Sequence, residues 1–70
     1  MDIKAQIIPK PAEGTRLVVA PHTMPAIKGK GDINYLCGNC NTEIVEKVNK
    51  GQVHNIVILC SVCGNYNEIA

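Results

Sequence analysis

The chain has 70 residues, a formal net charge of +1 and only two aromatic residues, Tyr35 and Tyr66. A chain this short forms one domain at most and usually needs a metal, disulfides or a partner subunit, because folding buries too little of its surface. The near-neutral charge excludes the strongly basic class of nucleic-acid binders but not a local basic patch.

Residues 1–32 contain all four prolines, which remove backbone donors and restrict φ. This part of the chain is therefore predicted to hold no long helix and only short edge strands. Two β-prone runs, residues 3–8 and 15–20, are separated by a turn-like segment and could pair as a hairpin. Both a partly ordered arm and an ordered two-stranded addition to the following domain fit this pattern.

Residues 27–32 hold two glycines and alternating cations, with no apolar side chain beyond the first residue. This composition is typical of a linker. A phosphate-binding loop on Gly29 and Gly31 would need a following helix and a Gly-Lys-Ser/Thr ending, and the sequence has neither. We therefore divide the chain into an N-terminal arm with short strands and a linker, residues 1–32, and a second domain, residues 33–70.

The second domain shows a regular order of apolar runs, cysteine pairs and turns. Its clearest strand is residues 53–59, which are rich in β-branched side chains and end directly before the second cysteine pair. Residues 49–52 are predicted to form a tight turn, in which Gly51 supplies a positive φ. Residues 42–48 fit a strand or a single helical turn. We expect a strand, because a hairpin with residues 53–59 would return the second cysteine pair to the first.

Four cysteines form two Cys-x-x-Cys pairs separated by nineteen residues. Two residues within a pair let both sulfurs point to one side of a tight turn, and the long spacer can return the second turn opposite the first. The sequence lacks the features of a signal peptide and of a membrane span, so we expect a cytoplasmic protein, whose thiols stay reduced. We therefore predict a tetrahedral site for one metal ion, whose ligands are Cys37, Cys40, Cys60 and Cys63.

The residues beside the cysteines support this prediction. In such turns the chain enters positive φ just after the second cysteine, so that backbone N–H groups can point to the thiolates. Asn41 and Gly64 occupy these two positions, and Gly38 relaxes the first turn.

Residues 35–70 resemble a zinc ribbon, in which two Cys-x-x-Cys turns bind zinc at the end of a β-hairpin. The resemblance implies a small β fold with a Cys₄ zinc site, preceded here by the N-terminal arm. Residues 58–67 also resemble the second knuckle of small prokaryotic zinc-ribbon proteins, including the phage Com-like translational regulators. Com-like proteins tend to carry a proline and a basic residue inside this knuckle, where the chain has Ser61 and Val62.

A closed Cys₄ site leaves no coordination position for water or substrate, so the predicted zinc is structural and no small-molecule substrate is expected. The two histidines, His22 and His54, belong to no recognisable catalytic motif. We expect an exposed loop position for His22 and a solvent-facing strand position for His54. The sequence therefore predicts a protein that is not an enzyme.

The predicted function is that of a binding module, in which zinc fixes a rigid hairpin whose surface engages a protein or a nucleic acid (RNA or DNA). The cations lie among carboxylates in the arm and at the predicted hairpin turn, as on an ordinary solvated surface.

Two alternatives remain open. One is a rubredoxin-like iron electron carrier, against which the shortage of aromatic residues argues. The other is a thiol redox or metal-handling protein.

Overall fold

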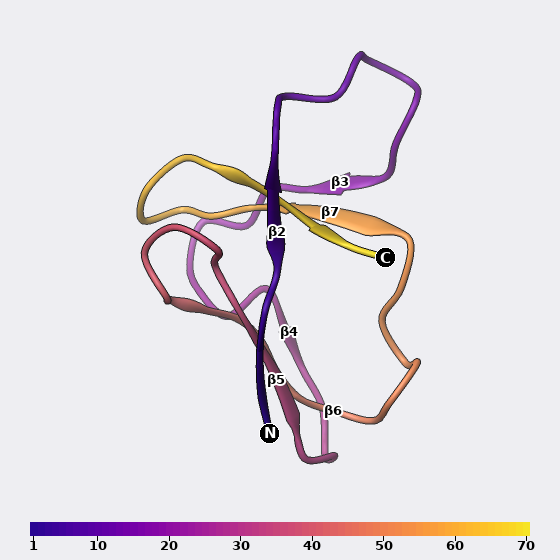
Figure 1. Cartoon of the computed structure of the whole chain (residues 1–70), viewed down its shortest axis with the longest axis vertical. Helices are drawn as coiled ribbons and strands as arrows, with labels where there is room; N and C mark the ends of the chain where they lie inside the picture. Colours follow the sequence, from indigo (N-terminus) through magenta and orange to yellow (C-terminus); the bar gives the residue numbers. More distant parts are fainter.

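The computed structural model describes the whole chain, residues 1–70, as a small all-β protein, which confirms the predicted fold class. Short strands form two four-stranded sheets, which occupy the upper and lower parts of the molecule in Figure 1. The strands are β1 (Asp2–Lys4), β2 (Gln6–Ile8), β3 (Val18–Val19), β4 (Ile27–Lys28), β5 (Ile33–Leu36), β6 (Glu43–Val48), β7 (Ile56–Leu59) and β8 (Tyr66–Ile69). The structure has no helix that could cross a membrane.

A β-hairpin forms the centre of each sheet. In the first sheet, of order β1-β5-β6-β4, β5 pairs antiparallel with β6. In the second sheet, of order β2-β8-β7-β3, β7 pairs antiparallel with β8. The first knuckle, residues 37–40, connects β5 to β6, and the second knuckle, residues 60–63, connects β7 to β8. Each cysteine pair therefore lies at the tip of its own hairpin.

The predicted hairpin between residues 42–48 and 53–59 is wrong. Both segments contain a strand, but β6 and β7 belong to different sheets. The backbone is left-handed at Lys47, Gly51 and Asn55, with φ of 55°, 78° and 52°, and these bends carry the chain away from a direct return along β6. The strand predicted over residues 53–59 is shorter in the structure, where it is β7. The positive φ predicted at Gly51 is confirmed.

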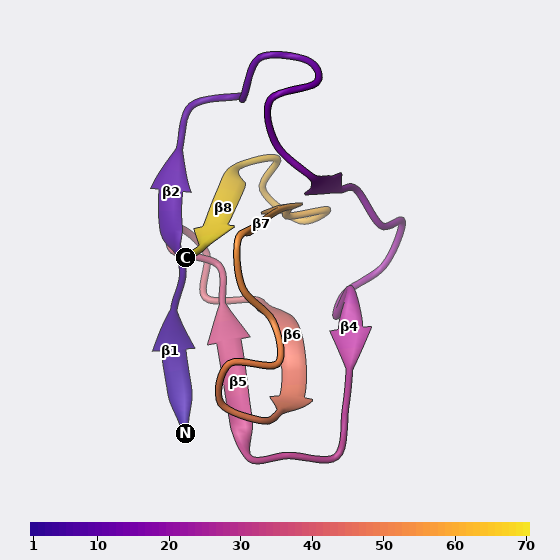
Figure 2. The same ribbon diagram turned by 90° about the vertical axis from the view of Figure 1, so that its right-hand side faces the viewer.

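The N-terminal strands flank the two central hairpins. β1 lies parallel to β5 and β4 parallel to β6, whereas β2 lies antiparallel to β8 and β3 parallel to β7. The predicted hairpin between residues 3–8 and 15–20 is therefore wrong, because each segment pairs instead with the open edge of a central hairpin. Figure 2 shows β1 and β2 end to end along one side of the molecule.

Ala5 divides the predicted strand of residues 3–8 between the two sheets. Its side chain is buried, and its N–H donates to the carbonyl of Leu36, 2.8 Å away at the end of β5. β1 therefore ends beside the first knuckle, and β2 continues from there along β8.

Residues 27–32, predicted as a linker, contain β4 and follow β6 closely. Gly29 N–H donates to the carbonyl of Glu46 at 2.9 Å, and Gly31 N–H donates to that of Lys47 at 2.7 Å. A Cβ atom on Gly31 would lie 2.4 Å from backbone atoms of β6, so the close approach of the two backbones requires this glycine.

The main core is one cluster that both hairpins share and that includes the first cysteine of each knuckle. Its members are Ala5, Ile33, Cys37, Ile44, Val45, Val48, Ile56, Ile58, Cys60 and Ile69. Partly buried side chains of the first 32 residues pack against it, among them Ile3, Val19 and Met24. The cysteine cluster and the core are therefore one packing unit.

Candidate metal centre

Backbone hydrogen bonds shape the first knuckle into a tight turn. Cys37 N–H donates to the carbonyl of Thr42 at 2.8 Å, and Asn41 N–H donates back to the carbonyl of Cys37 at 3.0 Å. Asn41 has a φ of 63°, a conformation that asparagine adopts more readily than most residues with a Cβ atom. The chain after the second cysteine is therefore folded back over the first.

The second knuckle repeats this pattern. Cys60 N–H donates to the carbonyl of Asn65 at 2.9 Å, and Gly64 N–H donates to the carbonyl of Cys60 at 2.9 Å. Gly64 has a φ of 77°, so the positive φ predicted just after each cysteine pair is confirmed. The two knuckles therefore present their sulfurs through the same local geometry.

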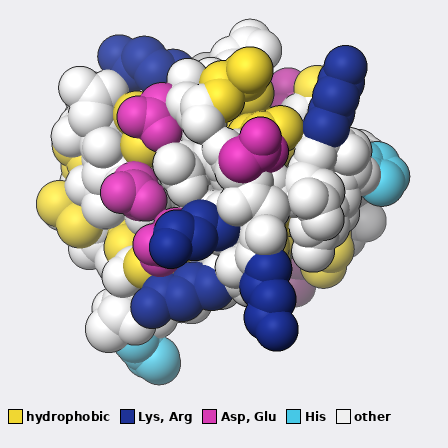
Figure 3. All heavy atoms as spheres, turned by 90° about the horizontal axis from the view of Figure 1, so that it is seen from below, with side chains coloured by type: hydrophobic (Ala, Val, Ile, Leu, Met, Phe, Trp, Pro, Cys, Tyr) yellow, Lys and Arg dark blue, Asp and Glu magenta, His cyan; other side chains and the backbone are white.

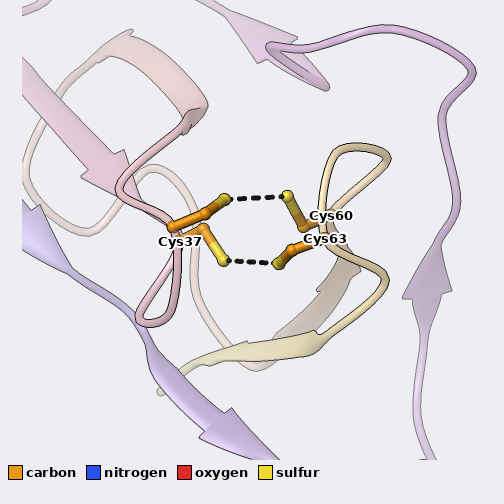
Figure 4. Close-up of side chains that lie close together, drawn as sticks. Cys37, Cys60 and Cys63 are labelled. Atoms are coloured by element: carbon orange, nitrogen blue, oxygen red, sulfur yellow. Dashed lines mark hydrogen bonds between the residues drawn. The ribbon is translucent and has the colours of Figure 1, made fainter.

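The four cysteine sulfurs converge between the two knuckles, and all four Sγ atoms lie within 4.8 Å of one another. Cys37 Sγ is 3.5 Å from Cys63 Sγ, and Cys40 Sγ is 3.6 Å from Cys60 Sγ (Figure 4). Sulfurs of a tetrahedral zinc site with Zn–S bonds of about 2.3 Å lie ~3.8 Å apart, whereas those of a disulfide lie ~2.05 Å apart. The four cysteines are therefore positioned to bind one metal ion.

Burial differs between the two cysteines of each knuckle. Cys37 and Cys60 are fully buried at 0% exposure. Cys40 and Cys63 are only partly buried. The centre is therefore anchored in the core on one side and approaches the surface on the other.

Side-chain donors contact the two outer sulfurs. The Thr42 hydroxyl lies 3.1 Å from Cys40 Sγ, and Asn65 Nδ2 donates to Cys63 Sγ at 3.4 Å. Thr42 and Asn65 occupy the same position, two residues after the second cysteine of their knuckle. Such donors disperse the charge of a thiolate and orient it, which a centre of four thiolates around a divalent cation requires.

These donors also change the acidity of the thiols. Hydrogen bonds from the side chain and backbone N–H of Asn65 lower the pKa of Cys63 to about 6. Hydrogen bonds from Thr42 lower the pKa of Cys40. Burial raises the pKa of Cys60 to about 11. The outer sulfurs are therefore favoured as thiolates, whereas ionisation of the buried Cys60 requires a cation beside it.

Asn67 on β8 is the one buried polar residue, and its side chain is 0% exposed. Its Oδ1 accepts the N–H of Gly38 at 2.9 Å, and its Nδ2 donates to Cys37 Sγ at 3.5 Å. One side chain of the second hairpin thus supports the first knuckle. Sequence reasoning misses this residue, because nothing in the local pattern separates Asn67 from the asparagines that are exposed in turns.

Neither histidine belongs to the centre. Both are exposed, and the loop position predicted for His22 is confirmed. His54 lies in the bend before β7 rather than in a strand, and its Nδ1 is 3.1 Å from the carbonyl oxygen of Gly51.

Comparison with known proteins does not assign the chain to a family. No protein-family model matches it, and no curated protein or solved structure gives a significant match. The likeness to a zinc ribbon therefore rests on the four-cysteine cluster in its small β fold.

Proposed function

We propose that the four thiolates bind one Zn²⁺ whose role is structural. The observation that carries the proposal is the convergence of four sulfurs from two equivalent knuckles, with a polar donor beside each outer sulfur. Four sulfur ligands complete a tetrahedral shell, which leaves no position for water or substrate. We therefore assign no enzymatic reaction to this site.

Zinc is favoured over iron by the surroundings of the site. Both metals accept four thiolates in a tetrahedral arrangement. The chain has only two aromatic residues, and one of them, Tyr66, lines a hollow together with residues 10–14 and 16–18. Scarce aromatic cover and two partly exposed sulfurs suit a structural ion better than an electron carrier, whose redox potential depends on shielding from solvent.

An ion at this point would join the two sheets. Cys37 and Cys40 extend from the β5–β6 hairpin, and Cys60 and Cys63 extend from the β7–β8 hairpin. Zinc-finger peptides gain roughly 10–16 kcal/mol from zinc at neutral pH, which is as large as the whole stability of a typical domain. We propose a cytoplasmic location, because a reducing compartment keeps all four thiols available to the metal.

The metal content of protein purified without added metal tests this proposal. We expect one zinc per chain by elemental mass spectrometry and no visible absorption. Iron with an intense thiolate spectrum would overturn structural zinc in favour of electron transfer. Protein that folds without any metal would overturn the metal centre in favour of thiol redox chemistry.

We further propose that the zinc-stabilised fold is a binding module, and that an anionic partner is the first class to test. Pairing of β4 with β6 places Lys28 opposite Glu46, the residues after β4 bring Lys30 close to Lys47, and Lys50 follows in the turn after β6. All four side chains are exposed. Figure 3 shows the molecule from below, where cationic side chains gather with carboxylates among them. This surface supports a salt-sensitive contact with a nucleic acid (RNA or DNA) or an acidic protein.

Fluorescence anisotropy with labelled RNA and DNA of mixed sequence tests the nucleic-acid partner. We expect binding that weakens steeply with salt and at least tenfold in the double variant Lys30→Glu, Lys47→Glu. Lys4→Glu, on the opposite edge of the same sheet, is the matched control for charge. Binding that ignores both salt and the double variant would favour a protein partner held by apolar contacts.

A further inference from the structure

The second sheet has an apolar outer face that the main core does not include. Strand pairing places Val57 directly opposite Val18 on one side and Glu68 on the other, so these three side chains share a face. Asn67 points to the other face, where it contacts the metal centre. Val57 is fully buried at 0% exposure, yet it lies outside the main core cluster. A second, smaller apolar layer therefore lies on the outer face.

The loop between β2 and β3 folds over part of this outer face. It projects from the top of the molecule in Figures 1 and 2. Arg16 of the loop forms an ion pair with Glu68 of β8. Between the loop and Tyr66 of β8 lies a hollow of about 510 Å³, lined by residues 10–14, residues 16–18 and Tyr66. The loop thus leaves an open hollow beside β3.

Two neighbouring apolar side chains are exposed at the rim of this hollow. Leu17 is 66% exposed and Val18 is 38% exposed. Scattered single apolar residues on a surface need no explanation, but adjoining exposed apolar residues, here beside a hollow lined by both apolar and charged side chains, are a feature of surfaces that become buried on association. This rim is therefore a candidate for contact with another chain.

β3 is an edge strand with free backbone groups. It pairs only with β7, and the carbonyl of Leu17 accepts the N–H of Val57 at 3.0 Å. Because successive residues of a strand alternate in direction, the N–H and carbonyl of Val18 point away from β7. The edge strands of the first sheet, β1 and β4, carry Lys4 and Lys28, which discourage strand addition, whereas β3 carries no charge.

The charges around the hollow are self-complementary. Lys10 and Glu13 both line it and neither takes part in an ion pair, whereas Arg16 is already paired with Glu68. A two-fold interface brings the same patch of two copies together, so each charge needs its opposite within that patch. Lys10 of one copy can therefore meet Glu13 of the other.

We propose that the rim formed by Lys10, Glu13, Leu17 and Val18 binds a second copy of this chain in a two-fold dimer. The two β3 strands lie side by side and antiparallel, and the exposed apolar side chains pack across the axis. β3 has only two residues, so the contact is small and the dimer forms at micromolar to millimolar protein concentrations. The dimer does not depend on which metal fills the centre, since the knuckles contribute no residue to it.

Sedimentation velocity of the metal-loaded protein across this concentration range tests the proposal. We expect a concentration-dependent shift from monomer to dimer in the wild type and at least tenfold weaker association in Leu17→Ser. Val62→Ser is the matched control, because Val62 is equally exposed at 66% but lies in the second knuckle. Each variant is checked for the wild-type metal content and circular dichroism, so that unfolding is not mistaken for lost association. A wild type that stays monomeric throughout, or a Val62→Ser variant as weak as Leu17→Ser, overturns the proposal.

Charge reversal separates a two-fold contact from other modes of association. Lys10→Glu and Glu13→Lys each place like charges opposite one another in the homodimer, so each variant alone should associate more weakly. An equimolar mixture should recover the wild-type dimer, because both cross-axis contacts of the mixed dimer then join opposite charges. Failure of the mixture to recover overturns the two-fold arrangement. Growth into larger assemblies also overturns it, because that outcome requires head-to-tail addition.

Discussion

Asn67 Nδ2 lies 3.5 Å from Cys37 Sγ, although Asn67 belongs to the second sheet and Cys37 begins the first knuckle. Through Oδ1 the same side chain accepts the N–H of Gly38 at 2.9 Å. A buried amide of one hairpin thus satisfies polar groups at the tip of the other. Asn67 therefore couples the two halves of the centre through the protein itself, in addition to any bond through a metal.

Replacing Asn67 by alanine should lower the free energy of unfolding by about 1–3 kcal/mol, because the partly buried N–H of Gly38 loses its acceptor and the buried Cys37 sulfur loses a donor. Urea unfolding of the metal-loaded protein, followed by circular dichroism, measures this change. Asn49→Ala is the control, since Asn49 is exposed in the turn after β6. Equal unfolding midpoints for the two variants would show that the amide does not support the knuckle.

Asn41 and Gly64 share a left-handed backbone, with φ of 63° and 77°, which glycine adopts freely and asparagine adopts more readily than most residues with a Cβ atom. Gly64→Val should cost more than ~1 kcal/mol, because a branched side chain is strained in the left-handed region, and Gly64→Asn should cost clearly less. A Cβ atom at Gly64 meets nothing within 4 Å, so crowding cannot mask the backbone effect. Thermal unfolding of the two variants gives the order, and equal melting temperatures would contradict it.

Gly38 has no room for a side chain, because neighbouring atoms lie too close to its Cα. A Cβ atom there would lie 2.5 Å from the carbonyl oxygen of Ala5 and 3.0 Å from the Ile7 side chain. Gly38→Ala should therefore displace the junction of β1 and β2 from the first knuckle and destabilise the fold by roughly 1–3 kcal/mol. Hydrogen exchange of the Ala5 amide, which donates to Leu36, should accelerate in the variant. Unchanged exchange at this amide would mean that the chain accommodates the methyl group elsewhere.

Loss of one sulfur ligand should unfold the chain, because the ion contributes more stability than so small a core. We expect Cys60→Ser to lose its β-sheet circular dichroism and its metal. Chelation of the metal from the wild type should produce the same loss, and added zinc should reverse it. A serine variant with an unchanged spectrum would show that the site does not hold the fold together.

Acid should release the metal at a pH set partly by the donors around the outer sulfurs. Hydrogen bonds from Asn65 lower the pKa of the metal-free Cys63 thiol, and a bound cation lowers it further, so this thiolate resists protonation and the site loses its metal only as the pH falls below that lowered pKa. Asn65→Ala removes the main donor and should move the midpoint of release to higher pH. A chromophoric chelator reports the released metal, and Asn49→Ala serves again as the control. A midpoint that Asn65→Ala leaves in place would contradict this role of the amide.

The sequence by itself determined the local geometry of the candidate centre. Two residues between the cysteines of each pair form the turn, and the positive φ at Asn41 and Gly64 follows from the residue types that tolerate it. The all-β class likewise follows from prolines and β-branched runs, which exclude long helices. These features depend on neighbours a few positions apart, so spacing and composition are enough to predict them.

Only the tertiary structure decided which strands pair and which distant groups meet. The edges of β-strands are chemically alike, so composition did not reveal that β6 and β7 lie in different sheets or that each knuckle ends its own hairpin. The contact of Asn67 with Cys37 spans 30 positions of the chain. The need for Gly31 arises from a backbone that approaches it in space. Such contacts are non-local, because residues far apart in the sequence come together only when the chain folds around its core.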